Sequence, residues 1–376
     1  MRISDCALFR KKMFWFALIF AGIAVKICLL PVATGDYTGY FQSWIATIDE
    51  EGAIFALKNI KCIPIILYIL IFIVKIGVNP LVALKVFAIL FEYLLAFFVG
   101  KIAFLKYKDV IFVWIALSIV PLVPTVVLNS AYLTQSDAVY SALAMGSVYF
   151  LLKKSPLISV LLFALAFAYK MQAVMLLPFF FVMLLRRNVK WSYFLLIPAV
   201  YAFIAVPAWL TGRSFGELMT VFFNQSANFG LLTINFPNIY IWFDNANYNA
   251  IMPVGIAITC LSTLICGILL SRRKIVFTFE QWIRLVFLSA IIVPFLLPSM
   301  HERYMFLGDV AGILYFLILR KNVHFPIGII LVSLYSYLRC SRYNEVLPMQ
   351  PAFFLYFLII ILAIVDFVKN LKIESR

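Results

Sequence analysis

The chain has 376 residues, of which 65% are hydrophobic and only 12% are charged, and its mean hydropathy is +1.05. This composition excludes an ordinary water-soluble domain, because apolar runs of membrane-spanning length recur from end to end. The net charge of +15 could suit a nucleic-acid-binding protein, but the basic residues are spread over many short clusters. We therefore expect one all-α, polytopic membrane domain over residues 1–376, with membrane lipids and no nucleic acid among its partners.

The hydrophobic segments, about 12–13 of them, predict the membrane helices. In chain order they are 13–31, 62–77, 81–104, 110–128, 137–152, 156–169, 172–186, 192–209, 250–270, 282–298, 304–319, 324–339 and 351–369. The first segment follows Arg10–Lys12 and lacks a small-residue cleavage site, so we expect an uncleaved helix rather than a signal peptide.

The basic clusters between these segments predict the topology, because Lys and Arg are enriched in cytoplasmic loops. They place both termini and the loops near residues 105, 154, 188, 273 and 320 on the cytoplasmic side. We expect the membrane to be a cell membrane, plasma or inner. An odd number of crossings must then join the outer loop after residue 31 to the loop near 105, yet two segments are available. Segment 62–77 is the shorter and contains Lys75, so we expect it to be re-entrant or incomplete.

The longest polar insertions, 32–61 and 211–249, are expected to be catalytic outer loops. In the first, Tyr40, Trp44 and Ile48 recur at every fourth position, which is typical of an amphipathic helix lying in the membrane interface. Asp36 precedes this helix. It is either a carboxylate at the hydrocarbon boundary, where desolvation raises its basicity, or a solvated loop acid or helix cap.

Two polar groups interrupt the apolar segments further along the chain. In "LNSAYLTQSDAVYSAL", Gln135 and Asp137 stand just before a helix, where Ser136 or Asp137 is either its N-cap, part of a site, or both. In "FALAFAYKMQAVMLLPFF", Lys170 and Gln172 separate two apolar runs. Lys170 either extends to the membrane surface or faces inward, where it needs an anion because an unpaired ammonium costs about 2.5–3.5 kcal/mol.

The stretch "LLPSMHERYMFLGDV" places His301, Glu302, Arg303 and Tyr304 between two apolar runs, and we expect these residues to begin a helix. Arg presents a planar fork that suits phosphate oxygens, and His offers a further donor. These residues therefore predict a buried phosphate site. The alternative is a structural ion pair of Glu302 with Arg303 or with Lys170.

Taken in order, these stretches resemble the GT-C superfamily of integral-membrane glycosyltransferases. The resemblance is to bacterial mannosyltransferase-like proteins related to the second mannosyltransferase of GPI-anchor synthesis. The matching stretches are the Asp36 loop, "TQSDAVYSAL", "LAFAYKMQAVMLLP", "LLTINFPNIY" and "LLPSMHERYMFLGDV". Thr134 stands where the family commonly has a glycine before Gln135. Asp36 is a single acid where some members have a pair, so we expect no metal and no other cofactor.

The resemblance implies a GT-C fold and inverting transfer of one hexose, possibly mannose, on the outer face of the membrane. The donor would be a polyprenyl-phosphate-linked sugar, and the acceptor a lipid-linked or cell-surface glycan. A sugar phosphate leaves without protonation, so a single carboxylate suffices, and we assign Asp36 as the catalytic base. The residues assigned to substrate binding are Gln135, Asp137, Lys170, Gln172, His301, Glu302, Arg303 and Tyr304, with Lys170, His301 and Arg303 holding the phosphate.

Other functions fit the sequence less well. A polysaccharide polymerase or lipid-oligosaccharide ligase uses a diphosphate donor, which needs more outer-loop cations than Arg213, Arg339 and Arg342 supply. A transporter or flippase predicts repeats with broken helices in both halves, whereas these ionisable groups gather on one face. A scaffold protein leaves Lys170 and Arg303 unexplained.

Overall fold

The computed structural model describes residues 3–227, 230–272, 274–341 and 346–373. Helices make up 79% of the structure, and each strand in the described residues is two residues long. Five of the described helices are long and apolar enough to cross a membrane, or six if the bent pair Ile111–Leu122 and Pro124–Tyr132 forms one span. This architecture is that of an all-α polytopic membrane protein.

The chain folds into two compact units. Unit 1 comprises Met1–Lys170 and Leu196–Val221, and unit 2 comprises Met171–Leu195 and Phe222–Arg376. Each unit is therefore discontinuous in sequence. A single domain over residues 1–376 stays a prediction.

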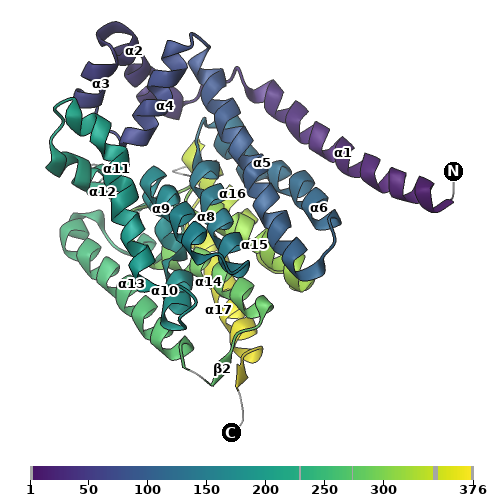
Figure 1. The fold of residues 1–376 in the computed structure, drawn as a ribbon. Helices are drawn as coiled ribbons and strands as arrows, with labels where there is room; N and C mark the ends of the chain where they lie inside the picture. The colour runs from purple at the N-terminus through teal and green to yellow at the C-terminus, as the bar shows by residue number, and fades with distance from the viewer. Residues whose placement is uncertain (1–2, 228–229, 273, 342–345, 374–376) are drawn as a thin grey trace. The chain divides into compact units, whose positions relative to one another are not determined.

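Unit 1 begins with a long helix, and Figure 1 shows three short helices, α2, α3 and α4, grouped together after it. Its α-helices are α1 (Ile3–Leu29), α2 (Gln42–Glu51), α3 (Ala53–Asn59), α4 (Pro64–Lys75), α5 (Pro80–Tyr107), α6 (Ile111–Ile119), α7 (Pro124–Val127), α8 (Asp137–Leu152), α9 (Pro156–Tyr169) and α11 (Leu196–Leu210). Shorter turns are η1 (Tyr37–Phe41), η2 (Val120–Leu122) and η3 (Leu128–Tyr132). α12 (Phe215–Ala227) contains residues of both units.

The core of unit 1 forms around α8, which packs against α5 and α9. Small residues permit this close packing, because helix backbones approach each other where side chains are short. Ala138, Ala142 and Ala144 of α8 are fully buried. In α5, a Cβ added to Gly100 would lie 2.5 Å from the Cα of Val113 in α6, so these two helices meet backbone to backbone.

Local signals explain where the helices of unit 1 begin. Asn79 accepts a hydrogen bond from the N–H of Val82 at 3.2 Å, and Pro80 occupies the first turn of α5. α4 has only 12 residues, which at about 1.5 Å per residue is roughly 18 Å, well short of a hydrocarbon core of about 30 Å. That segment 62–77 is re-entrant or incomplete stays a prediction, which the short length of α4 favours.

Unit 2 contains the helices of the C-terminal half, in which α14, α15, α16 and α17 pack against one another in sequence and α17 returns to α14 (Figure 1). Its helices and turns are η4 (Met171–Leu176), α10 (Leu177–Leu185), η5 (Trp191–Leu195), η6 (Ile239–Trp242), η7 (Asn245–Asn247), α13 (Tyr248–Leu270), α14 (Phe279–Leu296), α15 (Phe306–Leu319), α16 (His324–Ser341) and α17 (Gln350–Lys369). Its strands are β1 (Thr233–Ile234), β2 (Ile275–Val276), β3 (Met300–His301) and β4 (Lys372–Ile373).

One end of unit 2 collects its basic loops. Arg186 donates to the carbonyls of Leu270 at 3.1 Å and Ile275 at 2.8 Å, and β2 pairs in antiparallel fashion with β4. Asn322 donates to Asp366 at 3.2 Å. The loops after α10, α13 and α15 and the C-terminal segment therefore share one end, as the topology predicted from the basic clusters requires. The side of the membrane on which this end lies stays a prediction.

The predicted helices agree with the structure in most places. Every predicted apolar segment overlaps at least one helix, and the amphipathic pattern after Asp36 forms η1 and α2. Within α2 Ile48 is 4% exposed, whereas Tyr40 in η1 is 52% exposed. The apolar face of this region is therefore packed at its C-terminal end and open at its N-terminal end.

Candidate functional site

Asp36 lies directly before η1 and is half-buried. Its side chain makes no hydrogen bond that caps this turn. Instead, the Nε2 of Gln135 donates to the Oδ2 of Asp36 at 2.7 Å. The structure therefore brings together two predicted site residues that are 99 positions apart, and the amide orients the carboxylate.

Asp137, the first residue of α8, is fully buried and lies between two donors. Lys170 Nζ donates to its Oδ1 at 2.5 Å, and Asn129 Nδ2 donates to its Oδ2 at 2.8 Å. The backbone N–H of Asp137 in turn donates to Asn129 Oδ1 at 3.3 Å, and Ser136 makes no side-chain cap. Asn129 therefore accepts the hydrogen bond from the first N–H of α8, and the carboxylate of Asp137 forms the ion pair with Lys170. The Lys170 side chain is 16% exposed and faces inward rather than extending to the surface.

Sequence reasoning missed a second buried ion pair, formed by Lys26 of α1 and Glu92 of α5. Their side chains are 1% and 0% exposed, and Ser130 also donates to Glu92. Ser130 follows Asn129 in η3, so one turn supplies donors to both buried acids. A partial signal was present: Glu92 is an acid inside the apolar segment 81–104 and so requires a partner, but nothing in the sequence identified Lys26 as that partner.

Both π-helical turns in the described part of the chain belong to this cluster. η1 follows Asp36 directly, and η3 contains Asn129 and Ser130, two residues that are fully buried. Wide turns of this kind occur frequently at functional sites, where they redirect side chains that a regular helix would turn away. The local backbone is therefore irregular where the polar side chains converge.

In unit 2, the stretch containing His301, Glu302 and Arg303 folds differently from the prediction. The expectation that these residues begin a helix is wrong, because β3 pairs in parallel with β1 and α15 begins only at Phe306. Ser299, with a φ of 57°, turns the chain before β3. The strand partner comes from the loop of residues 211–249, far away in sequence, so no local pattern could reveal it.

Glu302 is the centre of this motif and is 3% exposed. Arg303 Nη1 donates to its Oε1 at 2.7 Å, and His301 Nδ1 lies 3.7 Å from its Oε2. Burial alone would raise the pKa of Glu302, but the charge of Arg303, with a further contribution from the nearby His301, lowers it to about 2. The predicted ion pair of Glu302 is therefore with Arg303, whereas Lys170 pairs with Asp137.

Two further predicted residues lie in unit 2. Tyr304 is half-buried, with its ring centroid 5.1 Å from that of His301 and 5.8 Å from the guanidinium of Arg303. Gln172 is part of η4, and within the described residues its buried Oε1 has no hydrogen-bond partner. A buried acceptor without a donor costs about 1–3 kcal/mol, so this oxygen would gain from a ligand donor.

The described residues contain no group of three or more His, Cys, Asp or Glu side chains that could hold a metal ion. The sequence matches no protein-family model, and comparison with curated proteins identifies no relative. Unit 1 contains an oriented, half-buried carboxylate, Asp36. Unit 2 contains a guanidinium and an imidazole, those of Arg303 and His301, beside the buried acid Glu302.

Proposed function

We propose that this chain is a polyprenyl-phosphate-sugar-dependent glycosyltransferase with a GT-C fold. It would move one hexose, such as mannose, with inversion to a lipid-linked or cell-surface glycan on the non-cytoplasmic face of the membrane. The observation that carries the proposal is the Asp36 carboxylate, held by Gln135 among apolar helices next to buried polar residues. A carboxylate that is oriented and partly removed from water can act as a general base.

The proposed reaction needs one base and one set of phosphate ligands. An acceptor hydroxyl oxygen attacks the anomeric carbon, and its proton passes to Asp36. The bond from that carbon to the phosphate oxygen breaks, and polyprenyl phosphate leaves with the bonding electrons. Because phosphate leaves as an anion without protonation, no second carboxylic acid is required.

The hydrogen bonds support the remaining proposed roles. Arg303 and His301 bind the phosphate as negative charge grows on it, and Glu302 fixes Arg303. Gln135 orients the base. Tyr304 and Gln172 would contact the substrate, which the half-buried ring of Tyr304 and the buried amide oxygen of Gln172 permit.

The ion pair with Asp137 changes the role proposed for Lys170. A lysine paired with a fully buried aspartate at 2.5 Å has its charge compensated within the protein. We therefore assign Lys170 and Asp137 to positioning: Asp137 connects the start of α8 to Asn129, and Lys170 holds the carboxylate that makes this connection. The phosphate is left to His301 and Arg303.

The direct test is sugar transfer in vesicles containing the purified protein, radiolabelled polyprenyl-phosphate mannose, glucose or galactose, and glycolipids from the producing cell. Asp36→Asn should lower transfer by at least about 10²-fold, the usual contribution of a general base. Asp49→Asn is the matched control, because Asp49 is an exposed acid of the same loop, in α2. Full activity of Asp36→Asn would remove Asp36 as the base.

The same assay separates the closest alternative. If vesicles supplied with polyprenyl-phosphate hexoses show no transfer, but a polyprenyl-diphosphate oligosaccharide is consumed, the chain is a ligase or polymerase instead. The two donors differ in one phosphate and in the number of sugars. The identity of the consumed donor therefore decides between these activities.

A further inference from the structure

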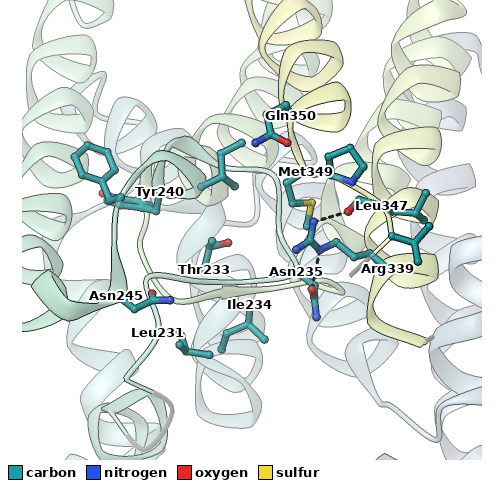
Figure 2. A pocket seen from close by; sticks show the side chains of 14 residues that line it. Leu231, Thr233, Ile234, Asn235, Tyr240, Asn245, Arg339, Leu347, Met349 and Gln350 are labelled. Atoms are coloured by element: carbon teal, nitrogen blue, oxygen red, sulfur yellow. Dashed lines mark hydrogen bonds between the residues drawn. The ribbon is translucent and has the colours of Figure 1, made fainter. Parts of the chain in front are cut away.

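Backbone carbonyls hold cationic side chains in both units of this protein. In unit 2, Arg339 Nη1 donates to the carbonyl of Leu347 at 2.6 Å, in the wall of a cavity of about 630 Å³ (Figure 2). In unit 1, Lys85 of α5 makes two such bonds, from its Nζ to the carbonyls of Leu29 at 2.8 Å and Val32 at 2.6 Å. These two carbonyls lie at the end of α1 and just beyond it, in the residues that lead to the Asp36 loop.

Lys85 is fully buried, and within the described part of the chain no acid pairs with it. Burying an ammonium group is costly, and an apolar side chain of similar length would fill the same space without this cost. The last carbonyls of a helix lack donors within the helix and carry the negative end of its dipole, so a cation stabilises them. The two bonds therefore fix the end of α1 to α5.

The chain between Val32 and Asp36 has little packing of its own. Ala33 and Gly35 are exposed, and a Cβ added to Gly35 would meet nothing within 4 Å. Asp36 is therefore placed mainly by the points at which the chain on either side of it is held. On the N-terminal side, the bonds from Lys85 are such a point.

The side chain that donates to Asp36 is held by the same helix. Gln135 follows η3, and in η3 Ser130 donates to Glu92 of α5. Glu92 and Lys85 are seven residues apart, which places them on one face of α5. One helix face therefore holds both of the segments that meet in the hydrogen bond between Gln135 and Asp36.

From these contacts, we infer that Lys85 is a positioning residue, which holds the end of α1 so that Asp36 meets Gln135. The effect on catalysis rests on the proposed function, whereas the placement of Asp36 does not. Lys85 is fully buried, so it acts through Asp36 rather than on the substrate. A displacement of about 1 Å in a catalytic group can lower the rate about 10²-fold, so an anchor four residues away affects turnover.

The placement can be measured without catalysis, by hydrogen–deuterium exchange of the purified full-length protein in lipid nanodiscs. Lys85→Met removes the donor, keeps most of the side-chain volume and leaves no buried acid without its partner, so this variant is expected to fold. Exchange of residues 30–38 should become about tenfold faster or more, because this segment loses hydrogen bonds from a charged donor. Exchange of residues 128–135, which Glu92 holds through Ser130, should stay unchanged.

A second variant and a control accompany this measurement. Lys85→Arg keeps the charge but lengthens the side chain, which in a fully buried position displaces the carbonyls that it holds. It should also accelerate the exchange of residues 30–38, and it decides the matter if Lys85→Met does not fold. Lys75→Met is the matched control, because Lys75 is an exposed lysine of the same unit, and its loss should change neither segment.

Where sugar transfer is observed, kinetics test whether Lys85 acts through Asp36. Lys85→Met should lower kcat at least about tenfold and leave the KM for donor and acceptor unchanged, because no substrate contact is removed. In the Asp36→Asn background the same change should have no further effect, since the base that Lys85 positions is already absent. A purely structural role would lower the amount of folded protein and leave the kcat of the folded fraction as it is.

The outcomes separate this inference from the proposed function. Faster exchange confined to residues 30–38 supports the placement, even in preparations that show no transfer. Unchanged exchange, or an equal rise in residues 128–135, would overturn the inference, even if transfer is observed. An unchanged kcat in Lys85→Met, or a loss that is equally large in the Asp36→Asn background, would also overturn it, because Lys85 would then not act through Asp36.

Discussion

The buried pair of Lys26 and Glu92 makes a strong prediction about stability. Lys26 bonds to one carboxylate oxygen of Glu92 and Ser130 bonds to the other, and both charged side chains are almost fully inaccessible. Removing one member leaves the other charge buried without its partner. Such changes cost about 3–5 kcal/mol, whereas replacing both charges at once is often close to neutral.

We expect Lys26→Met and Glu92→Gln each to lower the free energy of unfolding by about 3–5 kcal/mol. The double variant should lose less than either single variant, because no buried charge then lacks its counterion. The measurement is reversible unfolding in mixed micelles with increasing SDS, followed by circular dichroism. The four proteins form a double-mutant cycle whose coupling energy isolates the pair.

A control cycle with Lys75→Met and Asp49→Asn uses two exposed residues. Each of these changes should shift stability by no more than about 0.5 kcal/mol, and the two effects should add. If the Lys26 and Glu92 effects also simply add, the two charges do not stabilise each other and the interpretation of the pair is refuted.

Three further predictions concern the candidate site. Thr134 has a φ of 60° and a buried hydroxyl without a hydrogen-bond partner in the described structure. Because glycine adopts this backbone conformation without strain, Thr134→Gly should raise the free energy of unfolding by about 1 kcal/mol in the same SDS assay. A loss of stability would contradict the strain argument. The folded pKa of Glu302, about 2, lies below its ordinary value of 4.5, so the ionised carboxylate stabilises the fold above about pH 4.5 and this contribution is lost as the pH falls towards 2. Thermal unfolding between pH 6 and 2.5 should show wild type losing about 3 kcal/mol more than Glu302→Gln, and parallel curves would exclude this role. Arg303→Ala should raise the KM for the polyprenyl-phosphate sugar about tenfold or more, with Arg187→Ala as control, and an unchanged KM would leave Arg303 a structural ion-pair partner only.

The helices were predictable from the sequence because the membrane imposes one rule along the whole chain. Backbone groups in hydrocarbon must bond within their own segment, so a long apolar run forms a helix. The predicted segment 81–104 accordingly corresponds to α5 (Pro80–Tyr107), whose start is fixed by Asn79 and Pro80. Counting the crossings led to the prediction that segment 62–77 is an incomplete span, and α4 is accordingly only 12 residues long.

The polar contacts were only partly predictable. Asp137 and Lys170 were both predicted site residues, but the ion pair between them was not predicted. Lys26 and Glu92 were missed because single charges inside long apolar runs change the mean hydropathy little. The strand pairing of His301 could not be predicted, because it depends on a loop whose position is set by tertiary packing.

The ion pairs also decide where an anionic donor can find positive charge. In unit 1, Lys26 and Lys170 are balanced by Glu92 and Asp137, so these buried pairs carry no net charge. Glu302 likewise balances Arg303, and its low pKa keeps it ionised at neutral pH. In the proposed phosphate site, attraction therefore cannot come from an unbalanced charge of Arg303. Arg303 instead supplies geometry, because its planar guanidinium presents several N–H donors to phosphate oxygens.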